Sequence, residues 1–301
     1  MSRPTVSLII PFYNRERYLP RTLQSIAAQC FADYELLLVD NASTDGGAEV
    51  CRAWMQEHPE IVCELLYCSR HGASAARNVA LRKARGHFVY FFDSDDEIDP
   101  NYLCDASTLF AKADLIFSSS SLVFKDGRSH TRTIFRHGTL RDHVLCSMIN
   151  TQVMLARRSL FEEVGGWDEN LPSWNDWEIA IRLFLRAEQG DVRIAWLSKT
   201  YHRIHQHPDS ITGLGWAATA DNIEPAIDKA EKLFAYRPRE RRAAAARRTM
   251  IAAKLLRSGR LKKGWRWLRR ACHTDWHQAL FFPYTLLVDR GSWRIFRSLF
   301  P

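Results

Sequence analysis

The chain lacks the cysteine patterns that form the disulfide bonds of small folds or bind structural metals. Its seven cysteines stand at positions 30, 51, 63, 68, 104, 146 and 272, without repeated pairs. Because Cys63 and Cys68 have no matching second pair, a zinc site is not expected. Unpaired cysteines are typical of a reducing compartment. No secretory signal is recognisable at the start, so we expect a cytoplasmic protein.

Long apolar runs are also missing. The longest late run, Ala279 to Val288, contains Pro283 and is too short to span a bilayer. No internal repeat, low-complexity linker or nucleic-acid module is readable, so nucleic acid is not an expected partner. With 301 residues, 46% of them hydrophobic, the chain can bury one α/β core and an appendage.

A glycine-rich dinucleotide loop is missing as well. No Gly-x-Gly-x-x-Gly follows any predicted strand, which argues against a dinucleotide dehydrogenase. Apolar runs at 6–10, 35–39, 64–67 and 88–92 alternate with helical patterns. This alternation predicts a Rossmann-like, doubly wound, mostly parallel sheet. Ligands of such sheets gather at the carboxyl ends of the strands.

Three carboxylates end the last of these strands, at Asp93, Asp95 and Asp96. Crowded carboxylates repel one another, and a divalent ion shared with substrate phosphates relieves that repulsion. The alternative is a solvated acidic turn that enters a helix near Asp99 and Pro100. Polar residues that follow two other strands favour the ion site.

Several motifs in a fixed order resemble the family 2 glycosyltransferases, which are inverting enzymes with a GT-A-type fold. The resemblance covers about residues 5 to 212. It implies a nucleotide-sugar and acceptor domain at 1–215, followed by a basic, aromatic-rich helical region at 216–301. The matching segments are Ser7 to Asn14, Leu38 to Gly46, Ala73 to Ala80, Asp93 to Asp95, Gly165 to Glu169 and Asn175 to Glu178.

The resemblance also implies which residues contact the nucleotide sugar. Asp40 would accept a hydrogen bond from an imide N–H of the base, with Asp45 close by. For Asp45, capping of the following helix is an equal alternative. The full predicted donor set is Pro11, Tyr13, Asn14, Asp40, Asn41, Asp45, Arg77, Asn78, Asp93, Ser94, Asp95, Arg203, His205 and Ser210.

A divalent ion, Mn or Mg, would neutralise the departing diphosphate. By resemblance Asp95 is its main ligand, with Asp93 beside it. The later segment 201–212 carries His202, His205 and His207, and His207 best fits the family's metal-binding or phosphate-closing histidine. Read as alternating along a strand, the three histidines would share one face and need bind nothing.

Inversion requires a carboxylate that takes the proton of the acceptor hydroxyl. The resemblance assigns this role to Asp176. The preceding residue is Asn175, so the family's acidic pair is reduced to one carboxylate and a contribution from Glu178 stays open. Alternatively, Asp176 only caps a helix predicted at 177–185. Asp168 and Glu169 are expected on the acceptor side.

Positive charge is concentrated late in the chain. Residues 237–270 contain fourteen Lys or Arg and one acid, whereas the whole chain carries +8. Helices predicted at 241–258 and 261–272, separated by Gly259, would form a basic hairpin before an aromatic tail. Such helices suit an anionic membrane, here the inner face of the cytoplasmic membrane. They could equally pack onto the catalytic domain.

The sequence thus predicts a metal-dependent inverting glycosyltransferase. It would move a sugar from a nucleotide-diphosphate sugar, with UDP preferred, to a hydroxyl of a glycan or lipid-linked glycan in bacterial envelope polysaccharide or lipopolysaccharide synthesis. Two alternatives stay open. A nucleotidyltransferase would release pyrophosphate, but it usually has a Gly-rich basic loop where Pro11 to Asn14 stand. A non-catalytic scaffold with a decayed site would turn over no donor.

Overall fold

The computed structural model describes residues 3–124, 126–132, 138–147, 149–207 and 216–287. The chain divides into two compact units. The first comprises residues 1–137, 149–170 and 182–208, and the second comprises 138–148, 171–181 and 209–301. The second unit therefore takes two segments from the middle of the chain. The sequence suggests one boundary after residue 215, and that domain assignment stays a prediction.

The first unit is built on one mixed sheet, ordered β3-β2-β1-β4-β8-β6-β9-β5, with β7 paired to β6. The strands from β3 to β4 are parallel, β8 is antiparallel to both neighbours, and β6 and β9 are parallel. The predicted doubly wound, mostly parallel sheet is confirmed. The strands are β1 (Val6–Phe12), β2 (Tyr34–Asp40), β3 (Val62–Tyr67), β4 (Phe88–Phe91), β5 (Glu97–Ile98), β6 (Leu115–Val123), β7 (Ser129–Arg132), β8 (Met154–Arg157) and β9 (Ile194–His205).

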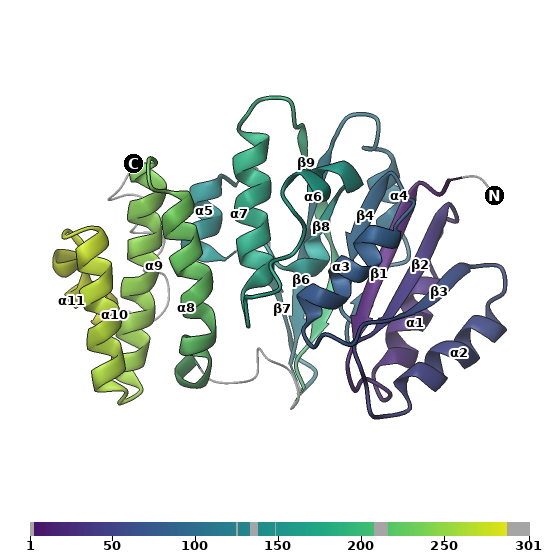
Figure 1. Ribbon diagram of the computed structural model, residues 1–301, viewed down its shortest axis with the longest axis horizontal. Helices are drawn as coiled ribbons and strands as arrows, with labels where there is room; N and C mark the ends of the chain where they lie inside the picture. The colour runs from purple at the N-terminus through teal and green to yellow at the C-terminus, as the bar shows by residue number, and fades with distance from the viewer. Residues whose placement is uncertain (1–2, 125, 133–137, 148, 208–215, 288–301) are drawn as a thin grey trace. The chain divides into compact units, whose positions relative to one another are not determined.

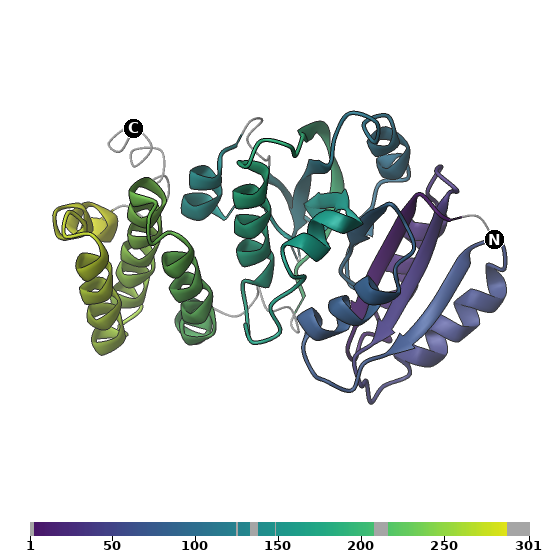
Figure 2. The ribbon, with the colours of Figure 1, turned by 45° about the horizontal axis from the view of Figure 1, so that its top comes forward.

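Strand β1 is buried along its whole length because helices cover both faces of the sheet. Leu8 and Ile10 belong to a core shared with α1 (Leu19–Ala27), α2 (Gly47–Glu57) and α4 (Tyr102–Ser107). The opposite face carries α3 (Ala73–Lys83) and α6 (Arg158–Glu163), as Figure 2 shows. There Phe91 packs edge-on against Phe161 at a centroid distance of 5.0 Å. A short 3-10 helix, η1 (Thr151–Val153), precedes β8.

The second unit is helical. It contains α5 (Leu140–Cys146), the start of α7 (Asn175–Ala187), α8 (Trp216–Leu233), α9 (Pro238–Arg257), α10 (Leu261–Thr274) and α11 (Gln278–Leu287). The last four lie side by side in Figure 1. The predicted basic hairpin is confirmed as α9 and α10, joined at Gly259 with a φ of 77°. A Cβ at Gly264 would lie 2.5 Å from Leu256, so these helices approach closely. None of the described helices is long and apolar enough to cross a membrane.

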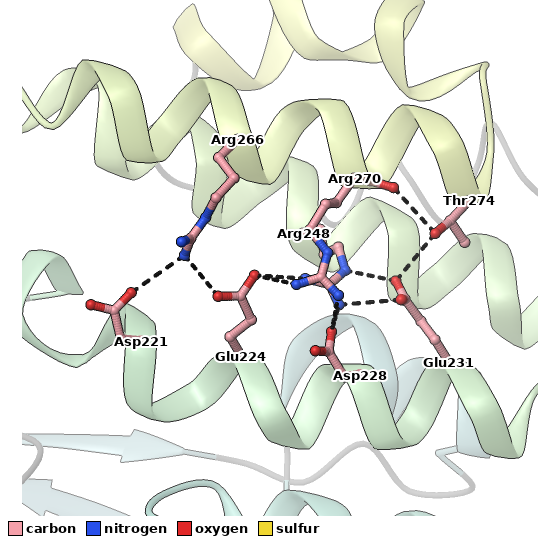
Figure 3. A network of polar contacts seen from close by, with 8 residues as sticks. All are labelled: Asp221, Glu224, Asp228, Glu231, Arg248, Arg266, Arg270 and Thr274. Carbon is pink, nitrogen blue, oxygen red and sulfur yellow. Dashed lines mark hydrogen bonds and ion pairs between the residues drawn. The ribbon is translucent and has the colours of Figure 1, made fainter.

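A buried arginine joins α8, α9 and α10. Arg248 of α9 has no exposed surface, and its guanidinium lies 5.4 Å from the centre of the Trp267 ring. It contacts three acids spaced three or four residues apart on α8, namely Glu224, Asp228 and Glu231 (Figure 3). Its Nε donates to Glu231 at 2.7 Å. One buried cation therefore compensates several partly exposed carboxylates of α8.

Helix α10 supplies further cations to the same acids. Arg270 donates to Glu224 at 2.6 Å and to Asp228 at 2.7 Å. Arg266 donates to Glu224 at 2.8 Å, and Lys263 pairs with Asp221 at 2.6 Å. A substantial part of the basic stretch is thus neutralised by the acidic face of α8. We name this network, comprising the acids of α8 with Arg248, Lys263, Arg266 and Arg270, the α8 charge seam.

A second polar contact in this unit lies between α5 and α7. The ring of His143 is fully buried, and its Nε2 donates to the carbonyl oxygen of Trp177 at 3.0 Å. The indole Nε1 of Trp177 donates to the carbonyl oxygen of His143 at 3.3 Å. Burial lowers the pKa of His143 to about 4, although the Trp177 carbonyl acts in the opposite direction. The neutral imidazole is therefore the folded form.

We expect Arg248→Met to destabilise the protein by about 3 kcal/mol, because it removes the fully buried cation that Glu224, Asp228 and Glu231 share. Urea unfolding would measure the loss. The exposed Arg269→Met on α10 is the matched control, with an expected change within about 0.5 kcal/mol. Equal effects of the two substitutions would contradict a structural role for the α8 charge seam.

We expect His143 to make the protein less stable as the pH falls from about 6.5 to 4. Below pH 6.5 the unfolded histidine binds a proton that the folded one does not, so the free energy of unfolding drops by up to about 3 kcal/mol. His143→Gln keeps an amide donor but removes this titration, so its stability should change less over that range. The exposed His273→Gln should instead follow the wild-type curve. Parallel curves for all three proteins would disprove the assignment.

Candidate active site

Loops after β1 and β2 are tied together where these parallel strands end. Asn14 has a left-handed φ of 51°, and its Oδ1 accepts a hydrogen bond from the Thr44 amide at 2.8 Å. The Asn14 amide donates to the hydroxyl of Ser43 at 3.1 Å. The Ser43 amide in turn donates to Asp40 Oδ1 at 2.8 Å. Two of the predicted donor residues, Asn14 and Asp40, therefore come together at one edge of the sheet.

Two neighbouring residues of the predicted set are engaged by the backbone. Asp45 accepts hydrogen bonds from the amides of Gly47 at 3.0 Å and Glu16 at 2.9 Å. Asp45 thus contacts the first residue of α2, but the N-cap of this helix is Gly46, without a side-chain cap. The side-chain Nδ2 of Asn41 donates to the Arg70 carbonyl at 2.7 Å, and its Oδ1 accepts from the Gly72 amide at 2.8 Å. Asn41 thus shapes the loop after β3.

Aromatic rings from two loops meet near the same edge. Tyr13 follows β1 and is 47% exposed. It meets the ring of His71 edge-on, at a centroid distance of 5.6 Å. The preceding Pro11, also in the predicted set, is buried within β1. His71 belongs to the loop before α3, and no sequence motif pointed to it.

The three carboxylates after β4 have different surroundings. Asp93 accepts from Arg77 at 2.7 Å and from the side-chain amide of Gln152 at 2.7 Å. Asp96 is only 2% exposed and accepts from Gln152 and from the His205 amide, the latter at 2.8 Å. Burial raises the pKa of Asp96 well above its usual range, and the charges of Asp95 and Asp93 add to this. Hydrogen bonds from Gln152 and His205 therefore compensate Asp96, while its burial disfavours the charged form.

Two opposing influences act on the pKa of Asp93. Burial raises the pKa of the Asp93 carboxyl, and the adjacent Arg77 opposes this effect. The intervening Ser94 is buried. Gln152, which links Asp93 to Asp96, comes from η1, far along the chain. Sequence reasoning missed it because a lone glutamine carries no motif.

Asp95 has basic and aromatic surroundings. Its Oδ2 lies 2.7 Å from Nε2 of His207 and 3.5 Å from Nε of Arg15. The ring of Tyr18 stacks on His207 at a centroid distance of 4.3 Å. Arg15 and Tyr18, just before α1, were not singled out in the sequence. Asp95 and His207 are thus brought together as predicted, while Asp93 is turned to Arg77 and Gln152.

The expectation that three histidines share one strand face is wrong. His202 is fully buried, with its ring nitrogens 3.1 Å from the Tyr90 hydroxyl and 2.7 Å from the Ser118 hydroxyl. Burial lowers its pKa to about 3. Positions 202 and 205 are three apart, so their side chains leave a strand on opposite faces. His202 is therefore a core residue.

Three further residues of the predicted set, His205, Arg203 and Ser210, belong to the segment 201–212. His205 pairs with Glu97 across the β5–β9 contact, and burial lowers the pKa of its imidazole while Glu97 raises it. Arg203 is exposed on β9. Ser210 lies outside the described residues. Within the described part of the chain, no group of three or more His, Cys, Asp or Glu side chains is arranged to hold a metal ion.

The start of α3 is tied to the segment at 165–169. The Arg77 guanidinium lies 4.4 Å from the centre of the Trp167 ring. Asn78 donates to the Trp167 carbonyl and to Glu169, both at 2.8 Å, and accepts from the Trp167 amide at 2.9 Å. Gly166 adopts a φ of 68°, and a Cβ there would lie 2.8 Å from Asn78 Oδ1. Asn78 therefore has a structural task in this contact.

Asp176 belongs to the second unit. It lies in the first turn of α7, is half-buried, and accepts a hydrogen bond from the Trp177 amide at 2.8 Å. Glu178 is fully buried and pairs with Lys229 at 2.7 Å. This ion pair gives Glu178 a structural role. In the first unit, Asp168 accepts from the Asn170 amide at 2.9 Å.

Comparison with known proteins places this geometry in a family. The family model described as glycosyl transferase family 2 matches residues 7–165, which include the acidic cluster. Glycosyltransferase GlyA of Streptococcus pneumoniae is 38% identical over 36% of this chain and 15% of that protein. The minor teichoic acid biosynthesis protein GgaA of Bacillus subtilis is 27% identical over 70% of this chain and 49% of that protein. The chain therefore spans half or less of the length of these relatives.

Solved structures share the fold. S. aureus TarS residues 1–349 in complex with UDP-GlcNAc superposes with a TM-score of 0.63 and 22% identity, covering 80% of this chain and 71% of that one. The mannosyltransferase PcManGT of Pyrobaculum calidifontis, in complex with GDP-Man and Mn2+, gives a TM-score of 0.58 and 20% identity, covering 97% and 89%. With its GT-A-type sheet and the family match over more than half its length, the chain belongs to glycosyl transferase family 2.

Proposed function

We propose that this protein is a metal-dependent inverting glycosyltransferase that transfers a sugar from a nucleotide-diphosphate sugar to a hydroxyl of a glycan or lipid-linked glycan. The observation that carries the proposal is the Asp95–His207 pair, with Arg15 beside it, close to the carboxyl ends of parallel strands. The family match supports the reaction class. A UDP donor is favoured by the UDP-GlcNAc complex of TarS.

The donor atoms of the pair suit a divalent ion. A carboxylate and an imidazole, 2.7 Å apart, are ligands that Mn2+ accepts, and Mg2+ takes one or two carboxylates plus phosphate oxygens. Asp95 and His207 would therefore hold the ion, with Asp93 near it. When bound, the ion would neutralise charge that develops on the leaving diphosphate. The Mn2+ of the PcManGT complex supports this part of the proposal.

The chain's own residues would bind and orient the donor. Arg15 carries a positive charge beside Asp95, where it can pair with a phosphate oxygen. Asp40 would accept from the imide of the base, and Tyr13 with His71 would offer ring surface to it. Arg77 would keep Asp93 in place through their 2.7 Å contact. Arg203 would be an outer contact, since it is exposed.

Asp176 would act as the general base. Its carboxylate would take the proton of the acceptor hydroxyl while the new bond forms from that oxygen to the anomeric carbon. The bond from the anomeric carbon to the phosphate oxygen breaks in the same step, and its electron pair leaves with the diphosphate. A single displacement inverts the anomeric configuration. The buried Glu178–Lys229 ion pair supports assignment of this role to Asp176 alone.

The acceptor class rests on the relatives. GgaA is named for minor teichoic acid biosynthesis, and another relative, of Bacillus subtilis, is a putative teichuronic acid biosynthesis glycosyltransferase, TuaG. We therefore propose synthesis of a bacterial envelope polysaccharide.

We also propose peripheral attachment to the inner face of the cytoplasmic membrane. Leu261, Lys262, Trp265 and Arg269 are exposed, and their spacing puts them on one face of α10. Trp265 is 57% exposed, and Trp276 just before α11 is 64% exposed. Exposed indoles beside cations suit the headgroup region of an anionic bilayer. The other cations of α10 pair with α8 and would not contribute.

Two substitutions distinguish the proposed role of Asp95 in donor binding from the proposed role of Asp176 as general base. Asp95→Ala should remove the Mn-dependent gain in UDP affinity, at least about tenfold, because the metal loses its carboxylate ligand. Asp176→Asn should leave UDP affinity within twofold but lower turnover by about 10² to 10⁴. Calorimetry with UDP and GDP, with and without Mn2+, and release of UDP from UDP-sugars would measure these effects.

Asp126→Ala, an exposed acid between β6 and β7, is the control and should behave like the wild type. Full activity of either site variant would remove the corresponding assignment. Release of pyrophosphate would indicate nucleotidyl transfer instead. A wild-type protein that binds no nucleotide under any condition would favour a decayed, non-catalytic role.

Vesicle sedimentation tests the membrane proposal. The wild type should bind phosphatidylglycerol-containing vesicles and not pure phosphatidylcholine ones. The double variant Lys262→Ala/Arg269→Ala should bind about tenfold or more weakly, since each cation near the surface contributes about 1 kcal/mol. Arg52→Ala/Arg128→Ala, which removes two exposed cations of the first unit, should bind like the wild type. Equal loss in both double variants would indicate attraction by net charge only.

A further inference from the structure

A tryptophan in a strained backbone conformation precedes α7. Trp174 has a φ of 59°, in the left-handed region that glycine and asparagine tolerate. For a bulky side chain this conformation costs conformational free energy, so the surroundings must hold it in place. Its carbonyl oxygen accepts the Glu178 amide at 3.0 Å and so forms part of the first turn of α7. Strain of this kind concentrates at functional positions.

Arg247 and Trp177, both in the second unit, contact the Trp174 ring. The Arg247 guanidinium of α9 lies 4.8 Å from the ring centre, in the geometry of a cation–π contact. Arg247 Nη1 also donates to the Leu145 carbonyl of α5 at 2.8 Å, which fixes the guanidinium. The ring of Trp177 lies 5.3 Å away at an interplanar angle of 50°. The orientation of the indole is therefore well determined.

Trp174 as a residue is nevertheless not fully buried. Trp177 and Trp267 in the same unit are buried, whereas Trp174 is half-buried. A tryptophan that served only to fill the interior would gain more free energy by full burial. Trp174 also lies two residues before Asp176, whose carboxylate is oriented by the Trp177 amide. An oriented indole thus belongs to the residue two positions before the proposed base.

From this arrangement we infer that Trp174 is the platform for a sugar ring of the acceptor, and that Arg247 is its positioning residue. The inference rests on the proposed function, in which Asp176 is the base. The C–H face of a pyranose is weakly positive and apolar, and it stacks on the negative face of an indole. Stacking there would leave the equatorial hydroxyls at the rim of the ring, where a carboxylate can accept a proton.

The contact from Arg247 also gives α9 a part in recognition. Arg247 and the buried Arg248 are adjacent on this helix, yet they have different partners. Arg248 pairs with the acids of α8, whereas Arg247 reaches α5 and Trp174. The basic helix thereby anchors the acceptor platform to the α8 charge seam. It follows that α9, through Arg247, would take part in acceptor binding.

Kinetics with defined probes test the platform. UDP-glucose, UDP-galactose and UDP-GlcNAc serve as donors, and p-nitrophenyl glycosides of glucose, galactose, mannose and N-acetylglucosamine serve as acceptors. Trp174→Asn fits the left-handed backbone but removes the ring, so the fold should persist. We expect a rise of at least tenfold in acceptor KM, with donor KM and acceptor-independent hydrolysis within twofold of wild type. Trp174→Phe, which keeps a smaller ring, should lie between.

Arg247→Met tests the positioning role, with the exposed Arg241→Met on the same helix as its control. The first should raise acceptor KM severalfold and the second should not. Unchanged acceptor KM in Trp174→Asn, an equal rise in donor KM, or no stimulation of the wild type by any glycoside would overturn the platform. If Trp174→Asn fails to fold, Trp174→Phe and Arg247→Met decide the question. No UDP release from any donor, even by hydrolysis, would instead overturn the proposed function.

Discussion

The side-chain amide of Gln152 is the contact on which the donor edge of the sheet depends. It donates to Asp93 and to Asp96 and so holds two carboxylates close together behind Asp95. Without compensation, three acids after one strand would repel one another. Gln152, Arg77 and the His205 amide compensate the first and third, and burial raises the pKa of Asp96. Asp95 then remains as the acid paired with His207 and Arg15.

Because their partners differ, the acids of the run 93–96 can both hold the site together and present one charged carboxylate. The outer members, Asp93 and Asp96, connect β4 to α3, η1 and β9, so they hold the site together. The middle member carries the charge that a cation would meet. The three acids lie in the turn between β4 and β5, outside the regular alternation of a strand, so their side chains meet different partners. Substrate binding and local stability thus rest on neighbouring residues with separate partners.

Opposite charges also compensate one another between the helices of the second unit. Arg248 is fully buried among acids of α8, and cations of α10 share those acids. Such a network fixes the register of three helices, since a shift by one residue would separate every pair. The same register places Arg247 beside Trp174. The exposed cations of α10 are those that this packing does not use.

Sequence alone determined the parallel sheet, the basic helical hairpin and the family, because each leaves a local pattern: apolar runs at fixed intervals, charge at helical spacing, and short motifs in order. It also indicated that Asp95 and His207 meet, through the resemblance. It misplaced His202 on the face of its neighbours and could not single out Gln152, Arg15 or Trp174. Those assignments depend on contacts between residues far apart in the chain. Only the tertiary structure decided them, because partner choice for a polar side chain is set by burial and proximity, which leave no pattern in neighbouring positions.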